Sequence, residues 1–141
     1  MSTSTSSTLA HYCLSSFSAA IREVKPSSCI QKALSLQNDR LCVNNKSYKL
    51  CKNVHLVAIG KAAPAMVEGA ELVLGPHFVD GIASVPTGTQ IPQNLRTKFL
   101  TGAENNLPDE QAIQNAEQIE RFIQTVKSQD QLILVRSSSI D

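Results

Sequence analysis

The chain contains few aromatic residues and almost no net charge. Its 141 residues include no Trp, and aromatic residues make up only 4%, whereas proteins that bind single-stranded nucleic acid rely on such rings for base stacking. The formal net charge of +1 at pH 7 gives no electrostatic footprint for nucleic acid or for an anionic membrane surface. No apolar run in the sequence approaches the roughly 20 residues that cross a bilayer. We therefore expect neither a nucleic-acid partner nor a membrane partner.

The four cysteines match no metal-binding or redox motif. They are scattered without a C-x-x-C pair, and no histidine completes a cluster with zinc-site spacing. In the absence of a secretory signal, we interpret them as reduced thiols of a cytoplasmic protein. The Ser- and Thr-rich residues 1–8 are expected to be disordered. A mitochondrial transit peptide is the alternative, but Arg22 is the only arginine nearby.

The hydrophobic pattern predicts a layered α/β fold in a single domain. A content of 42% hydrophobic and 18% charged residues is typical of a globular protein. From residue 54 onward, short apolar strands alternate with helices, which implies a mostly parallel, Rossmann-like sheet with right-handed crossovers. The predicted strands are Val54–Ile59, Gly81–Val85, Lys98–Leu100 and the buried Gln131–Val135, and the predicted helices are Ala63–Leu74 and Asp109–Lys127.

The first 50 residues are predicted to form two helices and a hairpin. The first helix covers Leu9–Val24 and ends before Pro26, because the residue preceding proline avoids helical geometry. Ser27 or Ser28 would cap a second helix that continues to Leu36. The hairpin pairs residues 40–43 with 47–50 around Asn44-Asn45, which tolerates the positive φ of a tight turn.

The junction between the strand at residues 54–59 and the helix that follows is the main candidate site. Gly60 allows a sharp turn, and Lys61 comes where the first free N–H groups of the helix point outward. Those N–H groups, the helix dipole and a fixed cation favour a phosphate or carboxylate. The motif is neither a P-loop nor a dinucleotide fingerprint, since both need further glycines. A surface lysine after an ordinary turn is the alternative interpretation.

Three loops are predicted to meet at one edge of the sheet, since ligands bind outside the carboxyl ends of parallel strands. The loops are Gly60-Lys61, Pro86-Thr87-Gly88 and Gly102-Ala103-Glu104-Asn105-Asn106. Their candidate site residues are Gly60, Lys61, Thr87, Gly88, Glu104, Asn105 and Asn106. We interpret these residues as candidate substrate- and phosphate-binding groups. The two asparagines also suit turns or helix caps, and Glu104 also suits a solvated loop, so these structural roles stay open.

Four stretches of the chain resemble the glycerate kinases of the glycerate 2-kinase type, the MOFRL-associated family. They are Ala33–Leu36, Val57–Ala63, Gly81–Gly88 and Gly102–Asp109, of which the last is the most specific. Their order and spacing agree from about residue 9 to residue 135. The resemblance implies an enzyme that uses ATP and a divalent metal, Mg²⁺, to phosphorylate D-glycerate to 2-phosphoglycerate.

The resemblance also implies a role for Lys61. The Gly-Lys-Ala motif of the family falls on Gly60, Lys61 and Ala62, which makes Lys61 the catalytic lysine. Such a lysine would stabilise charge on the phosphoryl group in transfer or would orient the substrate carboxylate, because most phosphoryl-transfer catalysis is positioning and electrostatics.

The end of the chain departs from the family pattern. Glycines follow the matching strand in the family, whereas this chain continues with Arg136-Ser137-Ser138-Ser139, and serines restrict the approach of backbone N–H groups to a phosphate. We therefore expect residues 9–135 to be the N-terminal part of a glycerate kinase α/β domain, incomplete because the chain is truncated, with a divergent tail at 136–141. Such a chain would lack the metal site and would be inactive alone. The alternative is a non-catalytic binding or interaction module that keeps the anion-binding rim and self-associates through its open sheet edge.

Overall fold

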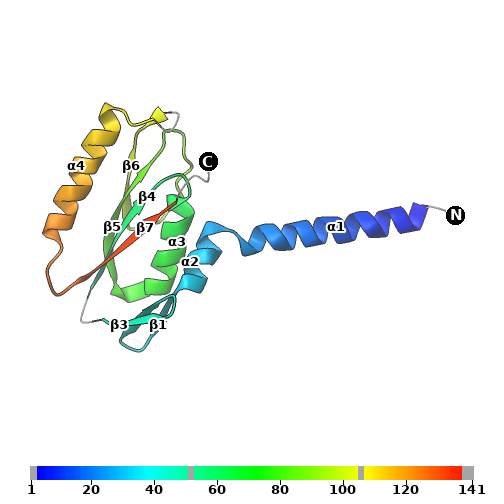
Figure 1. Cartoon of the computed structure of the whole chain (residues 1–141), viewed down its shortest axis with the longest axis horizontal. Helices are drawn as coiled ribbons and strands as arrows, with labels where there is room; N and C mark the ends of the chain where they lie inside the picture. Colours follow the sequence, from blue (N-terminus) through cyan, green and yellow to red (C-terminus); the bar gives the residue numbers. More distant parts are fainter. Residues whose placement is uncertain (1–2, 51–52, 105–106, 138–141) are drawn as a thin grey trace.

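A parallel sheet of four strands forms the centre of the molecule (Figure 1). The computed structural model describes residues 3–50, 53–104 and 107–137. The strands β4 (Val54–Ile59), β5 (Phe78–Val85), β6 (Thr97–Thr101) and β7 (Gln131–Arg136) lie in the order β6-β5-β4-β7. Strand order therefore reverses between β4 and β7, which is the switch point where doubly wound sheets bind ligands. The predicted Rossmann-like α/β fold is confirmed.

Helices cover both faces of this sheet (Figure 1). The helix α3 (Ala63–Leu74), supported by α2 (Pro26–Ala33), lies on one face, and α4 (Glu110–Thr125) lies on the other. Successive residues of β4 serve the two faces: Leu56 packs in the core beneath α3, and Val57 packs in the core beneath α4. Full burial of such a side chain contributes about 1.5–3 kcal/mol, so the apolar run in β4 holds both layers together.

A second, antiparallel sheet precedes the central one in the chain. It consists of β1 (Leu34–Gln37), β2 (Arg40–Val43) and β3 (Lys46–Lys49). The predicted hairpin is confirmed, and Asn44 in its turn has a φ of 52°. The prediction of helix through Leu36 is wrong, because apolar and polar residues alternate from Leu34 onward and the segment pairs with β2. Leu34 is 3% exposed in the core, so packing outweighed local helix propensity.

The start of α2 also differs from the prediction. No side chain caps the helix, and Pro26 occupies its first turn, with Lys25 in the position before it. Proline suits this first position because its missing N–H would have no partner there. The helix therefore begins before Ser27 and Ser28, so neither serine can act as its cap.

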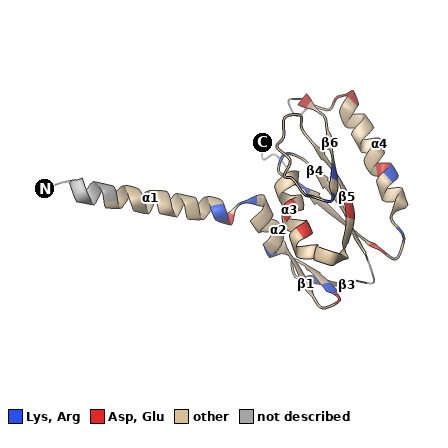
Figure 2. Cartoon of the chain, turned by 180° about the vertical axis from the view of Figure 1, so that it is seen from behind, with Lys and Arg blue, Asp and Glu red and all other residues tan. Residues whose placement is uncertain are grey.

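The first helix, α1 (Thr3–Glu23), projects away from the rest of the molecule (Figure 1). It begins six residues before Leu9, inside the stretch that we expected to be disordered; each residue added to a formed helix gains one backbone hydrogen bond. The predicted apolar face is not buried, since Phe17 is 64% exposed. Figure 2 shows that charge in α1 is confined to the end next to α2. None of the helices in the described parts of the chain has the length and apolarity needed to cross a membrane.

An ion pair joins the end of α1 to α2. The Lys32 ammonium contacts the Glu23 carboxylate. The hydrogen bond from Lys32, aided by its positive charge, holds the pKa of the Glu23 carboxyl below its ordinary value. The same contact raises the pKa of Lys32. Both side chains are well exposed, so the pair adds little to stability.

The strand β7 is half exposed, which corrects the prediction of a fully buried strand. Among the described strands it pairs only with β4. Val135 is buried toward α3, but Leu134 is 64% exposed on the opposite face, because α4 packs over β5 and β6. The apolar stripe of α4 is likewise only partly covered, with Ile119 9% and Ile113 60% exposed.

Candidate functional site at the carboxyl ends of β4 and β5

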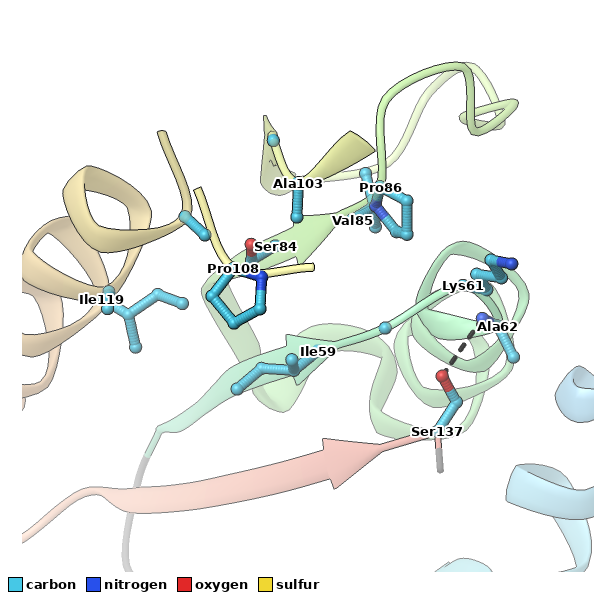
Figure 3. A pocket seen from close by; sticks show the side chains of 14 residues that line it. Ile59, Lys61, Ala62, Ser84, Val85, Pro86, Ala103, Pro108, Ile119 and Ser137 are labelled. Carbon is cyan, nitrogen blue, oxygen red and sulfur yellow. Dashed lines mark hydrogen bonds between the residues drawn. The ribbon is translucent and has the colours of Figure 1, made fainter. Parts of the chain in front are cut away.

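A pocket of about 630 Å³ opens at the carboxyl ends of β4 and β5 (Figure 3). Segments that are far apart in the sequence line it: the β4–α3 turn, the end of β5, the end of β6, α4 as far as Ile119 with the residue before its N-cap, and the residue after β7. The lining residues are Ile59, Gly60, Lys61, Ala62, Ser84, Val85, Pro86, Gly102, Ala103, Pro108, Ala112, Ala116, Ile119 and Ser137. The predicted convergence of loops at one edge of the sheet is thus present for part of each loop.

The β4–α3 turn contributes the only described cation in the pocket wall. Gly60 has a φ of 110°, which favours glycine, and its N–H donates to the carbonyl of Ser84 at 3.0 Å. The turn leads into α3, whose N-terminus has no side-chain cap. Lys61 is exposed at this end of the pocket, and its ammonium has no partner among the described residues. A free cation beside a helix N-terminus suits an anion.

Ser137, at the end of β7, completes this turn. Its hydroxyl accepts a hydrogen bond from the Ala62 amide at 3.2 Å, as the dashed line in Figure 3 shows, and its own amide donates to the Ile59 carbonyl at 3.0 Å. Sequence analysis assigned this residue to a divergent tail and missed it as a site residue. The signal that could have identified Ser137 is its position directly after β7, the strand that lies next to β4 at the switch point of the sheet.

The second loop enters the site only at its first residue. Pro86 lines the pocket, whereas Thr87 and Gly88 lie outside its lining and are exposed. Both the amide and the hydroxyl of Thr89 donate to the Pro86 carbonyl, at 3.2 and 2.6 Å. This turn directs the chain away from the pocket after Pro86.

The third loop also divides between pocket and solvent. Gly102 and Ala103 line the pocket, Glu104 is exposed outside the lining, and Asn105-Asn106 falls outside the described residues. The Asp109 carboxylate fixes the loop, since it accepts from the Ala103 amide at 3.0 Å and from the Ala112 amide at 2.7 Å. Asp109 is the N-cap of α4, which therefore begins one residue later than predicted.

A buried amide supports Ser84 in the floor of the pocket. Asn115 is 1% exposed, and its Nδ2 donates to the Thr101 carbonyl at 3.2 Å and to the Ser84 hydroxyl at 3.4 Å. Gln111 donates to the Asn115 Oδ1 at 3.2 Å, so all of these contacts fix one orientation of the amide. Sequence analysis missed both Ser84 and Asn115. The sequence signal for Asn115 was a polar amide four residues before Ile119, which places it on the same, inward-facing side of the predicted helix.

The pocket does not fit a divalent metal. Its described lining residues include no carboxylate, whereas Mg²⁺ prefers oxygen ligands that include one or two carboxylates. Within residues 3–50, 53–104 and 107–137, no group of three or more His, Cys, Asp or Glu side chains could hold a metal ion. We therefore derive no chemical step through a metal.

Comparison with known proteins decides the family. The family model described as "Domain of unknown function (DUF4147)" matches residues 12–138. The chain belongs to the DUF4147 family. This DUF4147 chain is 33% identical over 133 residues to a glycerate kinase of Danio rerio, a match that covers 86% of the chain and 26% of the fish protein. The chain thus spans about a quarter of the curated relatives that it matches.

Solved structures share the fold of the DUF4147 chain. A crystal structure of a Pyrococcus horikoshii OT3 protein matches with a TM-score of 0.77 and 24% identity, covering 89% of this chain and 28% of that one. The glycerate kinase of Thermotoga maritima matches with a TM-score of 0.66 and 21% identity, covering 91% of this chain and 28% of that one. The resemblance to glycerate kinases that the sequence motifs indicated is confirmed.

Proposed function

We propose that this chain supplies the lysine loop of a glycerate kinase, an enzyme that transfers the terminal phosphoryl group of ATP to D-glycerate and yields 2-phosphoglycerate. The observation that carries the proposal is the place of Lys61 at the mouth of a pocket where β4 meets α3, with no partner for its ammonium among the residues that the structure describes. The similarity to proteins named glycerate kinase supports the same activity.

In this proposal Lys61 acts by electrostatics. Negative charge is spread over the phosphoryl oxygens during transfer, and a fixed cation in a pocket stabilises that charge without reorganisation. The oxygen of the glycerate 2-hydroxyl would form the new bond to phosphorus while ADP leaves with the electron pair of the broken bond. The described lining holds no carboxylate to accept the hydroxyl proton, so the rest of the catalytic set has to come from outside these residues.

The test is a chimaeric enzyme. Residues 12–138 of this chain replace the matching segment of the Danio rerio glycerate kinase, and ATP-dependent phosphorylation of D-glycerate is measured. We expect Lys61→Ala to lower kcat/KM at least about a hundredfold, comparable to the loss of one preorganised donor. The control is Lys127→Ala, which removes an exposed lysine that does not line the pocket. Equal kinetics for the two variants would overturn the assignment of Lys61.

For the 141-residue chain alone we propose no glycerate kinase activity. Phosphoryl transfer needs nucleotide, metal and acceptor to be held together, and the described pocket offers a single lysine and no metal ligands. Turnover by the purified chain above that of its Lys61→Ala variant would contradict this expectation.

A second candidate, a non-catalytic module that self-associates, follows from the edge of the sheet. β7 pairs with β4 only, among the described strands, and it exposes Leu132 by 39% and Leu134 by 64%. An exposed apolar edge strand can pair with a second chain. A melting shift with ATP or D-glycerate favours the enzyme segment, because a ligand stabilises the state that binds it. Association without any such shift favours the module.

A further inference from the structure

We propose that one part of the pocket, which we call the apolar arm, holds the base of the nucleotide, and that the Ser84 hydroxyl donates a hydrogen bond to that base. The apolar arm consists of Ile59, Ala112, Ala116 and Ile119. This inference rests on the proposed function, which makes a nucleoside triphosphate the phosphoryl donor. The base of the nucleotide would lie in the apolar arm, and its phosphates would lie at the Lys61 end of the same pocket.

The size and the walls of the pocket favour a nucleotide over glycerate. A volume of about 630 Å³ is typical of pockets for molecules of cofactor or drug size, and a three-carbon acid would fill little of it. Glycerate also carries a carboxylate and two hydroxyls, whose hydration the apolar arm cannot replace. A flat aromatic base, in contrast, gains from leaving water for such walls.

Polarity changes from one side of the pocket to the other. Figure 3 shows Ile119 on the α4 side, Lys61 and Ser137 on the α3 side, and Ser84 between them. The matching ligand has an apolar, planar group at one end and an anionic chain at the other. A nucleoside triphosphate has this distribution of polarity.

Ser84 is oriented as a donor by the amide behind it. Its Oγ accepts from the Asn115 Nδ2, and the opposite orientation of that amide would lose the hydrogen bonds to the Thr101 carbonyl and from Gln111. The hydroxyl proton has no acceptor among the described residues and is free to donate into the pocket. Ring nitrogens and carbonyls at the edge of a base are the acceptors that fit.

Small side chains on α4 keep the apolar arm open. Ala112 and Ala116 are four residues apart and therefore lie on the same face of the helix. Ala116 is exposed at the opening of the pocket, so a larger residue there would enter the arm without disturbing the core. Gln114 lies on the same helix, is exposed, and does not line the pocket, which makes it a matched control position.

The experiment measures binding of adenosine, ATP and tripolyphosphate to the 141-residue chain by NMR titration. Adenosine tests the apolar arm without phosphate, and tripolyphosphate tests the lysine end without a base. We expect Ala116→Phe to weaken adenosine and ATP binding at least tenfold, and Ser84→Ala to weaken both roughly threefold to tenfold, the effect of one hydrogen bond. Tripolyphosphate binding should not change in either variant, and Gln114→Phe should bind all three ligands normally.

Several results would overturn the inference. They are failure of adenosine to bind, equal effects of Ala116→Phe and Gln114→Phe, or a loss of tripolyphosphate binding in Ser84→Ala. Melting temperatures of the variants show whether each one folds. If Ala116→Phe does not fold, Ala112→Leu provides a second variant that blocks the apolar arm. Failure of the proposed function looks different: adenosine binds with the expected sensitivity to Ala116→Phe, yet the chimaeric enzyme does not phosphorylate glycerate.

Discussion

Ser137 lies so close to Gly60 that a β-carbon at residue 60 would be 2.2 Å from the Ser137 Oγ and 2.8 Å from its carbonyl oxygen. The end of β7 therefore rests directly on the turn that carries Lys61. Through this contact the last described strand fixes the geometry of a loop about 75 positions earlier in the chain.

The first prediction follows from this contact. We expect Gly60→Ala to destabilise the fold by about 2–5 kcal/mol, since a positive φ costs about 1–2 kcal/mol for other residues and overpacking typically adds about 1–3 kcal/mol. Gly88→Ala is the control, because Gly88 also has a positive φ, 80°, but no atom within 4 Å of its β-position. Urea unfolding measures both. Equal losses of unfolding free energy in the two variants would mean that Ser137 moves aside at no energetic cost.

The second prediction concerns the amide beneath the pocket. Asn115→Leu should cost about 1–3 kcal/mol of unfolding free energy, because it removes the donor of two part-buried hydrogen bonds, to the Thr101 carbonyl and the Ser84 hydroxyl, each worth about 0.5–1.5 kcal/mol. Gln114→Leu, at an exposed position on the same helix, should stay within about 0.5 kcal/mol of the parent. Similar values for the two variants would show that water replaces the Asn115 bonds.

The third prediction is a pKa. Because the Lys32 hydrogen bond and charge stabilise the ionised carboxyl, the pKa of Glu23 should lie below the ordinary value of about 4.5. Because the pKa is lowered in the folded state, the ion pair stabilises the fold fully at pH values above the ordinary pKa. This stabilisation is lost as the pH falls through the lowered pKa. Carbon-detected NMR titration of Glu23 measures the shift, which should disappear in Lys32→Gln. A pKa that is the same with and without Lys32 would contradict the ion pair.

The fourth prediction concerns the sheet edge. If the β7 edge mediates self-association, Leu134→Lys should shift the chain toward the monomer, because lysine on an edge strand opposes pairing. Leu107→Lys is the control, since Leu107 is 70% exposed in a loop rather than on the edge. Light scattering after gel filtration measures the mass. A monomeric parent chain would exclude the edge as an interface.

Much of the central fold could be predicted from local sequence. The apolar run of β4 has no polar residue except His55, so both of its faces had to be covered, and this requirement alone implies a layered α/β sheet. The turn at Gly60, the hairpin turn at Asn44 and the start of α4 at Asp109 were also predictable, because each depends on the backbone or capping preferences of one residue.

The site was predictable only where it follows directly from a strand end. The sequence placed Lys61 at the β4–α3 turn by itself, because strand, glycine and helix are consecutive. Ser84, Asn115 and Ser137 were missed, since their roles come from hydrogen bonds across 31 and 75 positions of the chain. The helix predicted through Leu36 and the burial predicted for β7 were wrong for a related reason. Pairing partners and the extent of helix cover are long-range properties, and only the tertiary structure sets them.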